Sequence, residues 1–230
     1  MNKSLRSGIS FLLKCLTVLT ALGGLILSFL TSKDEGYKIG LARLTYFTGQ
    51  SNLWIGVTFL LVIFSNLFLP NAKRLKTLLY TLKYVFTVSI TITALVFFCF
   101  LAPFATPRYH VWSYSSYLTH LYAPLFAIAD FFVDDYKYKF TLRQKLYTVI
   151  PPSLYVFFTA LLAYFNVDFG RGVSYPYFFL NYFAPWGYFA IVDRPPFVLG
   201  TFYWLIILPS LVIIIGVIYA SIKNKQIKNA

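Results

Sequence analysis

Thr48 and His120 are the residues of this chain whose types best suit covalent chemistry. Thr48 is followed three and four positions later by Ser51 and Asn52, so these polar side chains share one face if the segment is helical. A neutral imidazole can take the proton of a hydroxyl as that hydroxyl attacks a carbonyl carbon. A threonine and a histidine therefore supply the minimum for nucleophilic catalysis, provided that the fold brings them together.

The composition indicates which kind of structure must position these residues. The chain has 230 residues, of which 59% are hydrophobic, 21% aromatic and only 12% charged, as is typical of a protein embedded in a bilayer. Six apolar runs each approach the ~20 residues that a helical span needs. They cover roughly residues 9–30, 47–69, 79–102, 115–133, 146–165 and 200–222. We therefore predict an all-α integral membrane protein in which residues 1–230 form a single six-helix transmembrane domain, which excludes nucleotide-fold enzymes and soluble scaffolds.

The net charge of +13 could suggest a nucleic-acid partner, but the positions of the twenty Lys and Arg residues argue otherwise. If the N-terminus is cytoplasmic, thirteen of them lie at inner positions, six lie outside, and Lys14 is within the first span. This positive-inside bias predicts that both termini are cytoplasmic. Basic loops beside anionic headgroups explain the charge, so we expect no nucleic-acid partner.

Depth in the membrane links the two candidate catalytic residues. With this topology, spans two and four both enter from the outer side, which places Thr48 in the first turn of one and His120 roughly 8 Å below the boundary in the other. Cys99 on span three shares that layer. The first turn of span two also has backbone N–H groups without helical partners, which favour a developing oxyanion. The alternative is a polar cluster in which His120 and Asn52 only bond helices together.

The outer segment 166–199 is long for a connection and rich in aromatic residues, including Tyr175 and Trp186. Its prolines argue against a seventh straight helix. One interpretation is an aromatic belt at the membrane interface. The other is a re-entrant or lid-like element over an outward-opening pocket, since irregular backbone at membrane depth must be buried or line a cavity.

Few other residues within the spans could carry chemistry. Lys14 and Asp130 lie at matching depths near the inner face, where we favour a structural salt bridge, or snorkelling by Lys14, over a proton relay. His110 falls in an outer loop, where an interfacial imidazole is the ordinary role. No spacing of His or Cys nominates a metal site, and we expect no cofactor.

Three local patterns resemble one family. They are the run 46–52 that opens span two, the run 120–124 together with Asp130 in span four, and Tyr175-Pro176-Tyr177 before span six. They are similar to the androgen-induced family of multipass membrane proteins, which includes hydrolases of fatty acid esters of hydroxy fatty acids and the androgen-dependent TFPI-regulating protein. This chain would be a remote, bacterial-type member, located in the plasma membrane.

The resemblance implies a mechanism. The family's catalytic threonine and histidine match Thr48 and His120, which implies attack by Thr48 on a lipid ester, an acyl-threonine intermediate and hydrolysis by water. Gln50, Ser51, Asn52, Cys99, Tyr175 and Trp186 are candidates for binding substrate or stabilising the oxyanion. No carboxylate is placed to orient His120, so Asn52 or a backbone carbonyl is expected to do so.

Two other functions stay open. Cys99 could be the acyl-accepting nucleophile of a lipid acyltransferase that uses the same histidine, because thiols are better nucleophiles than hydroxyls near neutral pH. Against this, Cys99 lies in a run of Phe and Leu, where a small buried hydrophobic residue is the commoner role. A small transporter or lipid-binding membrane protein without catalysis is the third possibility.

Overall fold

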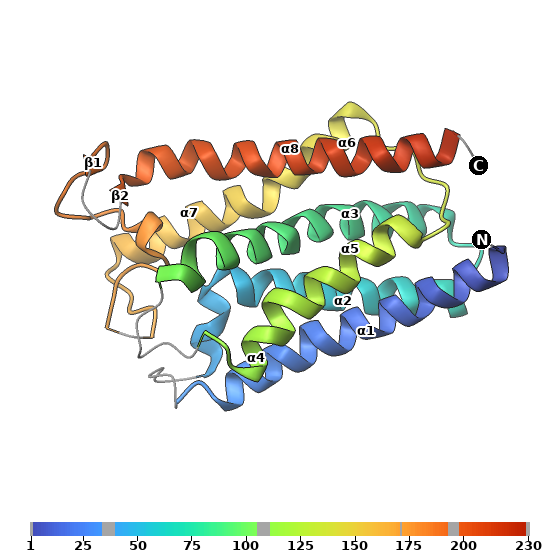
Figure 1. Ribbon diagram of the computed structural model, residues 1–230, viewed down its shortest axis with the longest axis horizontal. Helices are drawn as coiled ribbons and strands as arrows, with labels where there is room; N and C mark the ends of the chain where they lie inside the picture. The colour runs from blue at the N-terminus through green and yellow to red at the C-terminus, as the bar shows by residue number, and fades with distance from the viewer. Residues whose placement is uncertain (1, 34–39, 105–110, 171, 193–197, 229–230) are drawn as a thin grey trace.

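The protein is a bundle of long helices that run along one common axis (Figure 1). The computed structural model describes residues 2–33, 40–104, 111–170, 172–192 and 198–228. In these ranges the strands are one antiparallel pair of two residues each, β1 (Ile191–Val192) and β2 (Val198–Leu199). The chain begins and ends at the same end of the bundle, here called the terminal end; the end with β1 and β2 is called the loop end. The predicted all-α fold is confirmed.

Five helical stretches are long and apolar enough to cross a membrane. They contain α1 (Lys3–Leu30), α2 (Phe47–Phe68), α3 (Lys73–Val96), α6 and α7 (Leu142–Leu146 and Ile150–Tyr164) and α8 (Thr201–Lys228). Each coincides with one of the predicted spans. The part of the chain that the structure describes is therefore that of a multipass membrane protein.

The predicted fourth span is helical but divided. It consists of α4 (Tyr114–Tyr117), a π-helical segment (Leu118–Tyr122) and α5 (Ala123–Val133), which follow one another without a break. This run lies along α1 over much of the bundle (Figure 1). Gly24 of α1 permits the close approach, since a Cβ atom there would lie 2.8 Å from the Cβ of Leu118.

Four of the predicted spans are longer at the terminal end than their apolar runs, α3 and α8 among them. α3 begins at Lys73 rather than at residue 79, and α8 continues to Lys228 rather than ending at 222. Hydropathy detects only the apolar part of a helix, whereas lysine and arginine are good helix formers and extend it into the polar region. The short α6 begins with a capping box between Thr141 and Gln144.

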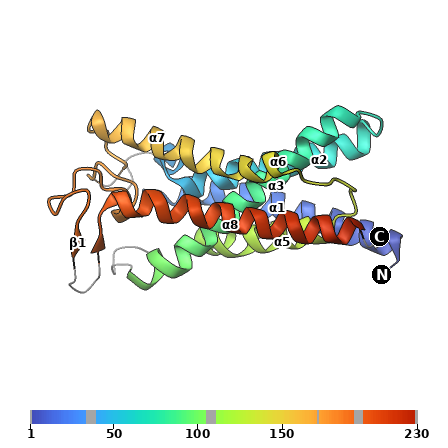
Figure 2. The same ribbon diagram turned by 90° about the horizontal axis from the view of Figure 1, so that it is seen from above.

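In its described residues, the aromatic segment after α7 contains no further long helix, as its prolines predicted. A single 3₁₀ turn, Phe178–Leu180, inserts between the helices, and Phe179 and Leu180 are buried there. Phe183 and Phe189 are exposed farther along the segment. Part of this segment therefore packs into the bundle, and the rest covers the loop end (Figure 2).

Buried charges tie several helices together near the terminal end. Lys14 of α1 lies 3.0 Å from Asp130 of α5 and 2.8 Å from Asp134, and Lys83 of α3 lies 2.5 Å from each aspartate. Lys223 of α8 donates to the carbonyl of Asp134. Burial disfavours the charged form of Asp134, but the charges of Lys83 and Lys14 outweigh it and hold its pKa far below the usual range. The predicted Lys14–Asp130 ion pair is confirmed, as part of a larger cluster.

Removing the Asp130 carboxylate leaves two buried lysines, Lys14 and Lys83, to share the single carboxylate of Asp134, so that one buried positive charge is uncompensated. We expect Asp130→Asn to lower the free energy of unfolding by about 3 to 5 kcal/mol, the usual cost of an uncompensated buried charge. Thermal unfolding in detergent micelles measures the change. Asp135→Asn is the matched control, because Asp135 is exposed, and equal melting temperatures of the two variants would contradict the structural role of the cluster.

Candidate active site

Thr48 and His120 meet near the loop end of the bundle. Thr48 Oγ1 lies 3.3 Å from His120 Nε2, slightly beyond the usual hydrogen-bond length for a nucleophile and its base. Thr48 is the second residue of α2, and His120 is in the π-helical segment before α5. His120 is buried and Thr48 is half-buried, so the threonine is the more accessible of the two.

A backbone carbonyl orients the imidazole. His120 Nδ1 lies 3.1 Å from the carbonyl oxygen of Ser116, which can only accept a hydrogen bond. The proton is therefore assigned to Nδ1, and Nε2 presents its lone pair to Thr48. The hydroxyls of Ser116 and Thr119 lie 3.2 Å from the same Nδ1. One of the two groups expected from the sequence, a backbone carbonyl, fills this role; Asn52 does not.

Two π-helical segments shape the surroundings of His120. One contains His120 itself, and the other, Phe97–Leu101, continues α3. The Phe97 ring stacks on the imidazole, with centroids 3.8 Å apart and 17° between the planes. A π turn inserts an extra residue into a helix and redirects its side chains, and such turns are frequent at functional sites. These irregular turns place His120 flat against Phe97 with its Nε2 toward α2.

The start of α2 is held by tyrosine hydroxyls. The N–H of Thr48 donates to the Tyr177 hydroxyl at 3.4 Å, and the N–H of Phe47 bonds to Tyr155, whose hydroxyl donates to the carbonyl of Thr45 at 3.1 Å. The first N–H groups of a helix have no partner within it. The Tyr177 hydroxyl therefore occupies the place predicted for an oxyanion.

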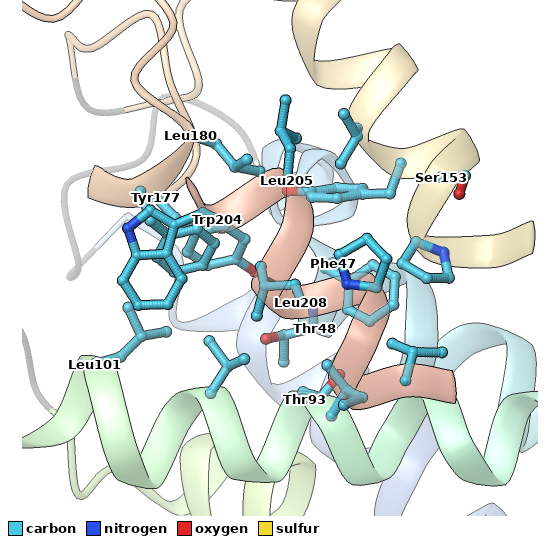
Figure 3. A pocket seen from close by; sticks show the side chains of 18 residues that line it. Phe47, Thr48, Thr93, Leu101, Ser153, Tyr177, Leu180, Trp204, Leu205 and Leu208 are labelled. Carbon is cyan, nitrogen blue, oxygen red and sulfur yellow. Dashed lines mark hydrogen bonds between the residues drawn. The ribbon is translucent and has the colours of Figure 1, made fainter. Parts of the chain in front are cut away.

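An apolar cavity of about 310 Å³ adjoins Thr48. It is lined by residues from α2, α3, α7, α8 and the segment around Tyr177, and Figure 3 shows Thr48 near the middle of the lining, with Leu101 and Trp204 to one side and Ser153 to the other. Thr48 thus contacts His120 on one side and borders the cavity on another. A ligand in the cavity would meet the threonine hydroxyl, while the imidazole remains behind it.

The polar residues that follow Thr48 bond helices together. Ser51 Oγ lies 2.8 Å from Thr93 Oγ1 of α3, and the Asn52 amide donates to the carbonyl of Thr119 at 3.2 Å. The Gln50 amide donates to the carbonyl of Leu44 at 2.9 Å. None of the three lines the cavity. These three residues position the start of α2 against its neighbours. Thr93 lines the cavity in their place.

The other sequence candidates lie away from the cavity. Cys99 is exposed, so the expectation of a buried Cys99 was wrong; it lies on the outward side of the π-helical segment that begins at Phe97. Tyr175 and Trp186 do not line the cavity either. Their places are taken by Tyr177 and by Trp204 at the start of α8. Tyr177 belongs to the same aromatic motif as Tyr175, two positions later. The motif therefore indicated the right segment, but the tyrosine chosen within it does not line the cavity.

Comparisons with known proteins found nothing that bears on this site. No family model, curated protein or solved structure matches this chain. The resemblance to the androgen-induced family therefore stays a prediction. Within the described ranges no three His, Cys, Asp or Glu side chains gather as metal ligands would. His110 lies outside those ranges.

Gly49 is required by the packing of the residues that precede α2. A Cβ atom there would lie 2.2 Å from the carbonyl oxygen of Arg43. We expect Gly49→Ala to displace the first turn of α2, which carries Thr48, and to lower the melting temperature. Gly23→Ala is the control, because a Cβ at Gly23 meets no atom within 4 Å and alanine stabilises a helix by up to about 1 kcal/mol relative to glycine. Thermal unfolding of both variants in detergent micelles measures the difference in melting temperature. A Gly49→Ala protein as stable as the Gly23→Ala protein would contradict the packing argument.

Proposed function

We propose that this protein is an intramembrane lipid ester hydrolase with Thr48 as nucleophile and His120 as general base. One observation carries the proposal: Thr48 lies between the His120 imidazole, 3.3 Å away, and an apolar cavity of about 310 Å³. An apolar pocket with a few convergent polar groups is the usual form of a site for a hydrophobic ligand. The proposed substrate is a long-chain acyl ester.

The proposed reaction has two stages. Thr48 Oγ attacks the ester carbonyl carbon while its proton passes to His120 Nε2, and the protonated imidazole then gives that proton to the departing alcohol oxygen. The product of this stage is an acyl ester on Thr48. In the second stage His120 takes a proton from water, the resulting hydroxide attacks the acyl carbon, and Thr48 Oγ leaves and recovers the proton. The Ser116 carbonyl stabilises the imidazolium formed in each stage, since it accepts from Nδ1–H.

Two donors lie where negative charge would develop. The Thr48 N–H and the Tyr177 hydroxyl lie 3.4 Å apart beside the nucleophile. In the ground state the N–H donates to the phenol oxygen. A carbonyl oxygen that inserts between them could accept from both, which is the arrangement that stabilises a tetrahedral intermediate.

The membrane setting is proposed on the same basis. The helical run 114–133 lies along α1, and the chain ends lie together at the terminal end, which carries the buried lysines and α6. With the positive-inside bias of the sequence, this supports six spans with both termini in the cytoplasm. The proposed location is the bacterial plasma membrane, with Thr48 toward its outer leaflet.

Loss of either catalytic group should abolish most turnover. We expect Thr48→Ala and His120→Ala each to reduce hydrolysis of p-nitrophenyl esters by about 10²- to 10⁴-fold, since general-base catalysis contributes that much, and the double variant to be no worse than either. Thr20→Ala is the control, because its buried hydroxyl bonds only to carbonyls of its own helix. Full activity of Thr48→Ala would end the proposal, whether or not the protein binds lipid.

Cys99→Ala tests the alternative acyltransferase. Because Cys99 is exposed and does not line the cavity, we expect its substitution to leave ester hydrolysis and transfer of the acyl group to added alcohols within about twofold of wild type, as for most surface substitutions. Loss of acyl transfer in this variant would instead assign the nucleophile to the thiol.

Removal of the phenol hydroxyl should affect the chemical step. We expect Tyr177→Phe to lower kcat by about 10²-fold, as loss of one oxyanion donor does in other enzymes, with little change in KM. Tyr175→Phe is the matched control, because Tyr175 belongs to the same motif but lies outside the cavity lining. Steady-state kinetics on a soluble ester measure both, and equal kcat values for the two variants would remove Tyr177 from the mechanism.

A further inference from the structure

The cavity is elongated along the helices. On α8 its lining extends from Trp204 to Val212, which is about 12 Å at 1.5 Å per residue. On α3 and the π-helical segment that continues it, the lining extends from Ile92 to Leu101 over a similar length. The cavity therefore continues from the loop end, past Thr48, toward the middle of the bundle.

The part of the cavity farther from the loop end is apolar. Ile92 of α3, Val212 and Pro209 of α8, and Pro152 and Val156 of α7 surround it. Ile92 and Val212 are buried and close its inner end. Among the residues that the structure describes, no charged side chain lines the cavity. A hydrocarbon chain is the ligand that this surface suits, because each methylene group buried there contributes about 0.8 kcal/mol.

The same part of the cavity is open at one side. Ser153 lines the cavity but is exposed, so the cavity reaches the surface of the bundle at α7. Figure 3 shows Ser153 on α7 at the edge of the lining, away from Leu101 and Trp204. The neighbouring Leu154 is 63% exposed and does not line the cavity, as expected for a side chain that faces lipid.

Prolines line the cavity on both helices. Pro209 lies inside α8 and has no N–H, so the carbonyl of Leu205, one turn earlier, lacks its helical donor. Pro152 lies in the first turn of α7. Leu205, Pro209 and Pro152 all line the cavity.

We propose that the cavity is an acyl-chain channel with a lateral opening between α7 and α8 at Ser153. The proposal rests on the proposed function, because Thr48 defines where the ester carbonyl lies. The acyl chain of the substrate extends from Thr48 past Pro209, and a chain longer than the channel continues through the opening into the hydrocarbon of the bilayer. The alcohol part of the ester lies toward Trp204 and Tyr177. Ser153 and Val156 thereby determine which chain lengths are accepted.

Acyl-chain selectivity tests the channel. We expect Ser153→Phe and Val156→Phe each to lower the ratio of kcat/KM for p-nitrophenyl palmitate over p-nitrophenyl butyrate by about tenfold or more, since contacts worth one or two methylenes already discriminate by that factor. Leu154→Phe is the matched control, on the same helix but facing lipid. A ratio in Ser153→Phe and Val156→Phe equal to that of Leu154→Phe would overturn the channel, and so would an equal loss on both esters.

A binding measurement separates the channel from the catalytic proposal. In a Thr48→Ala protein with Trp54, Trp112 and Trp186 changed to Phe, Trp204 is the remaining tryptophan. We expect 2,3-dibromostearic acid in detergent micelles, whose bromines lie beside the carboxyl group and so near Thr48, to quench Trp204 fluorescence, and Ser153→Phe, but not Leu154→Phe, to raise the concentration for half-quenching about tenfold. If the wild type hydrolyses no ester yet the single-tryptophan protein shows this pattern, the catalytic proposal fails and the channel stands. Absence of saturable quenching, or equal quenching in the two variants, overturns the channel.

Discussion

Two aspartates buried among lysines are the constraint on which this bundle depends. Asp130 and Asp134 contact Lys14 of α1 and Lys83 of α3 at 2.5 to 3.0 Å, and Lys223 of α8 bonds to the backbone beside them. A buried charge without a partner costs several kcal/mol. The relative positions of α1, α3, α5 and α8 are therefore restricted at the terminal end, before any feature of the loop end is considered.

The candidate active site lies at the other end of the same helices. α3 ends in the π-helical segment that carries Phe97, and α5 is preceded by the one that carries His120. α2 begins between them because Gly49 lets the preceding backbone approach closely and because tyrosine hydroxyls bond to its first N–H groups. A rigid cluster at one end and irregular helical turns at the other allow a buried base, an accessible hydroxyl and a cavity to coexist.

Much of this arrangement could be predicted from the sequence. Apolar runs gave the positions of the long helices, and the rise of 1.5 Å per residue was sufficient to place Thr48 and His120 at one depth. Depth does not say which way a side chain faces: Ser51, Asn52 and Cys99 share that layer, yet the first two bond neighbouring helices and Cys99 faces outward. The direction in which a side chain points depends on the rotation of its helix about the helix axis. The two π turns changed this direction, and the pattern of apolar residues does not reveal such turns.

The remaining features depend on packing between distant segments. Tyr177 and Trp204 reach the cavity because the aromatic segment folds inward at Phe178–Leu180, whereas Tyr175 and Trp186, equally aromatic, do not. The sequence did not predict that Lys83 and Asp134 belong to the same buried cluster as the Lys14–Asp130 pair. Each of the two lies near a predicted span end, where a charged side chain is ordinarily expected to be solvated. Lysine side chains are long enough to reach a buried carboxylate from there.

Covalent trapping of the nucleophile tests the central claim most directly. The purified protein is treated with a long-chain alkyl fluorophosphonate, digested and analysed by mass spectrometry to locate the phosphonylated residue. The account predicts modification at Thr48 that is lost in His120→Ala. Modification at another residue, or equal modification of Thr48 in wild type and His120→Ala, would contradict it.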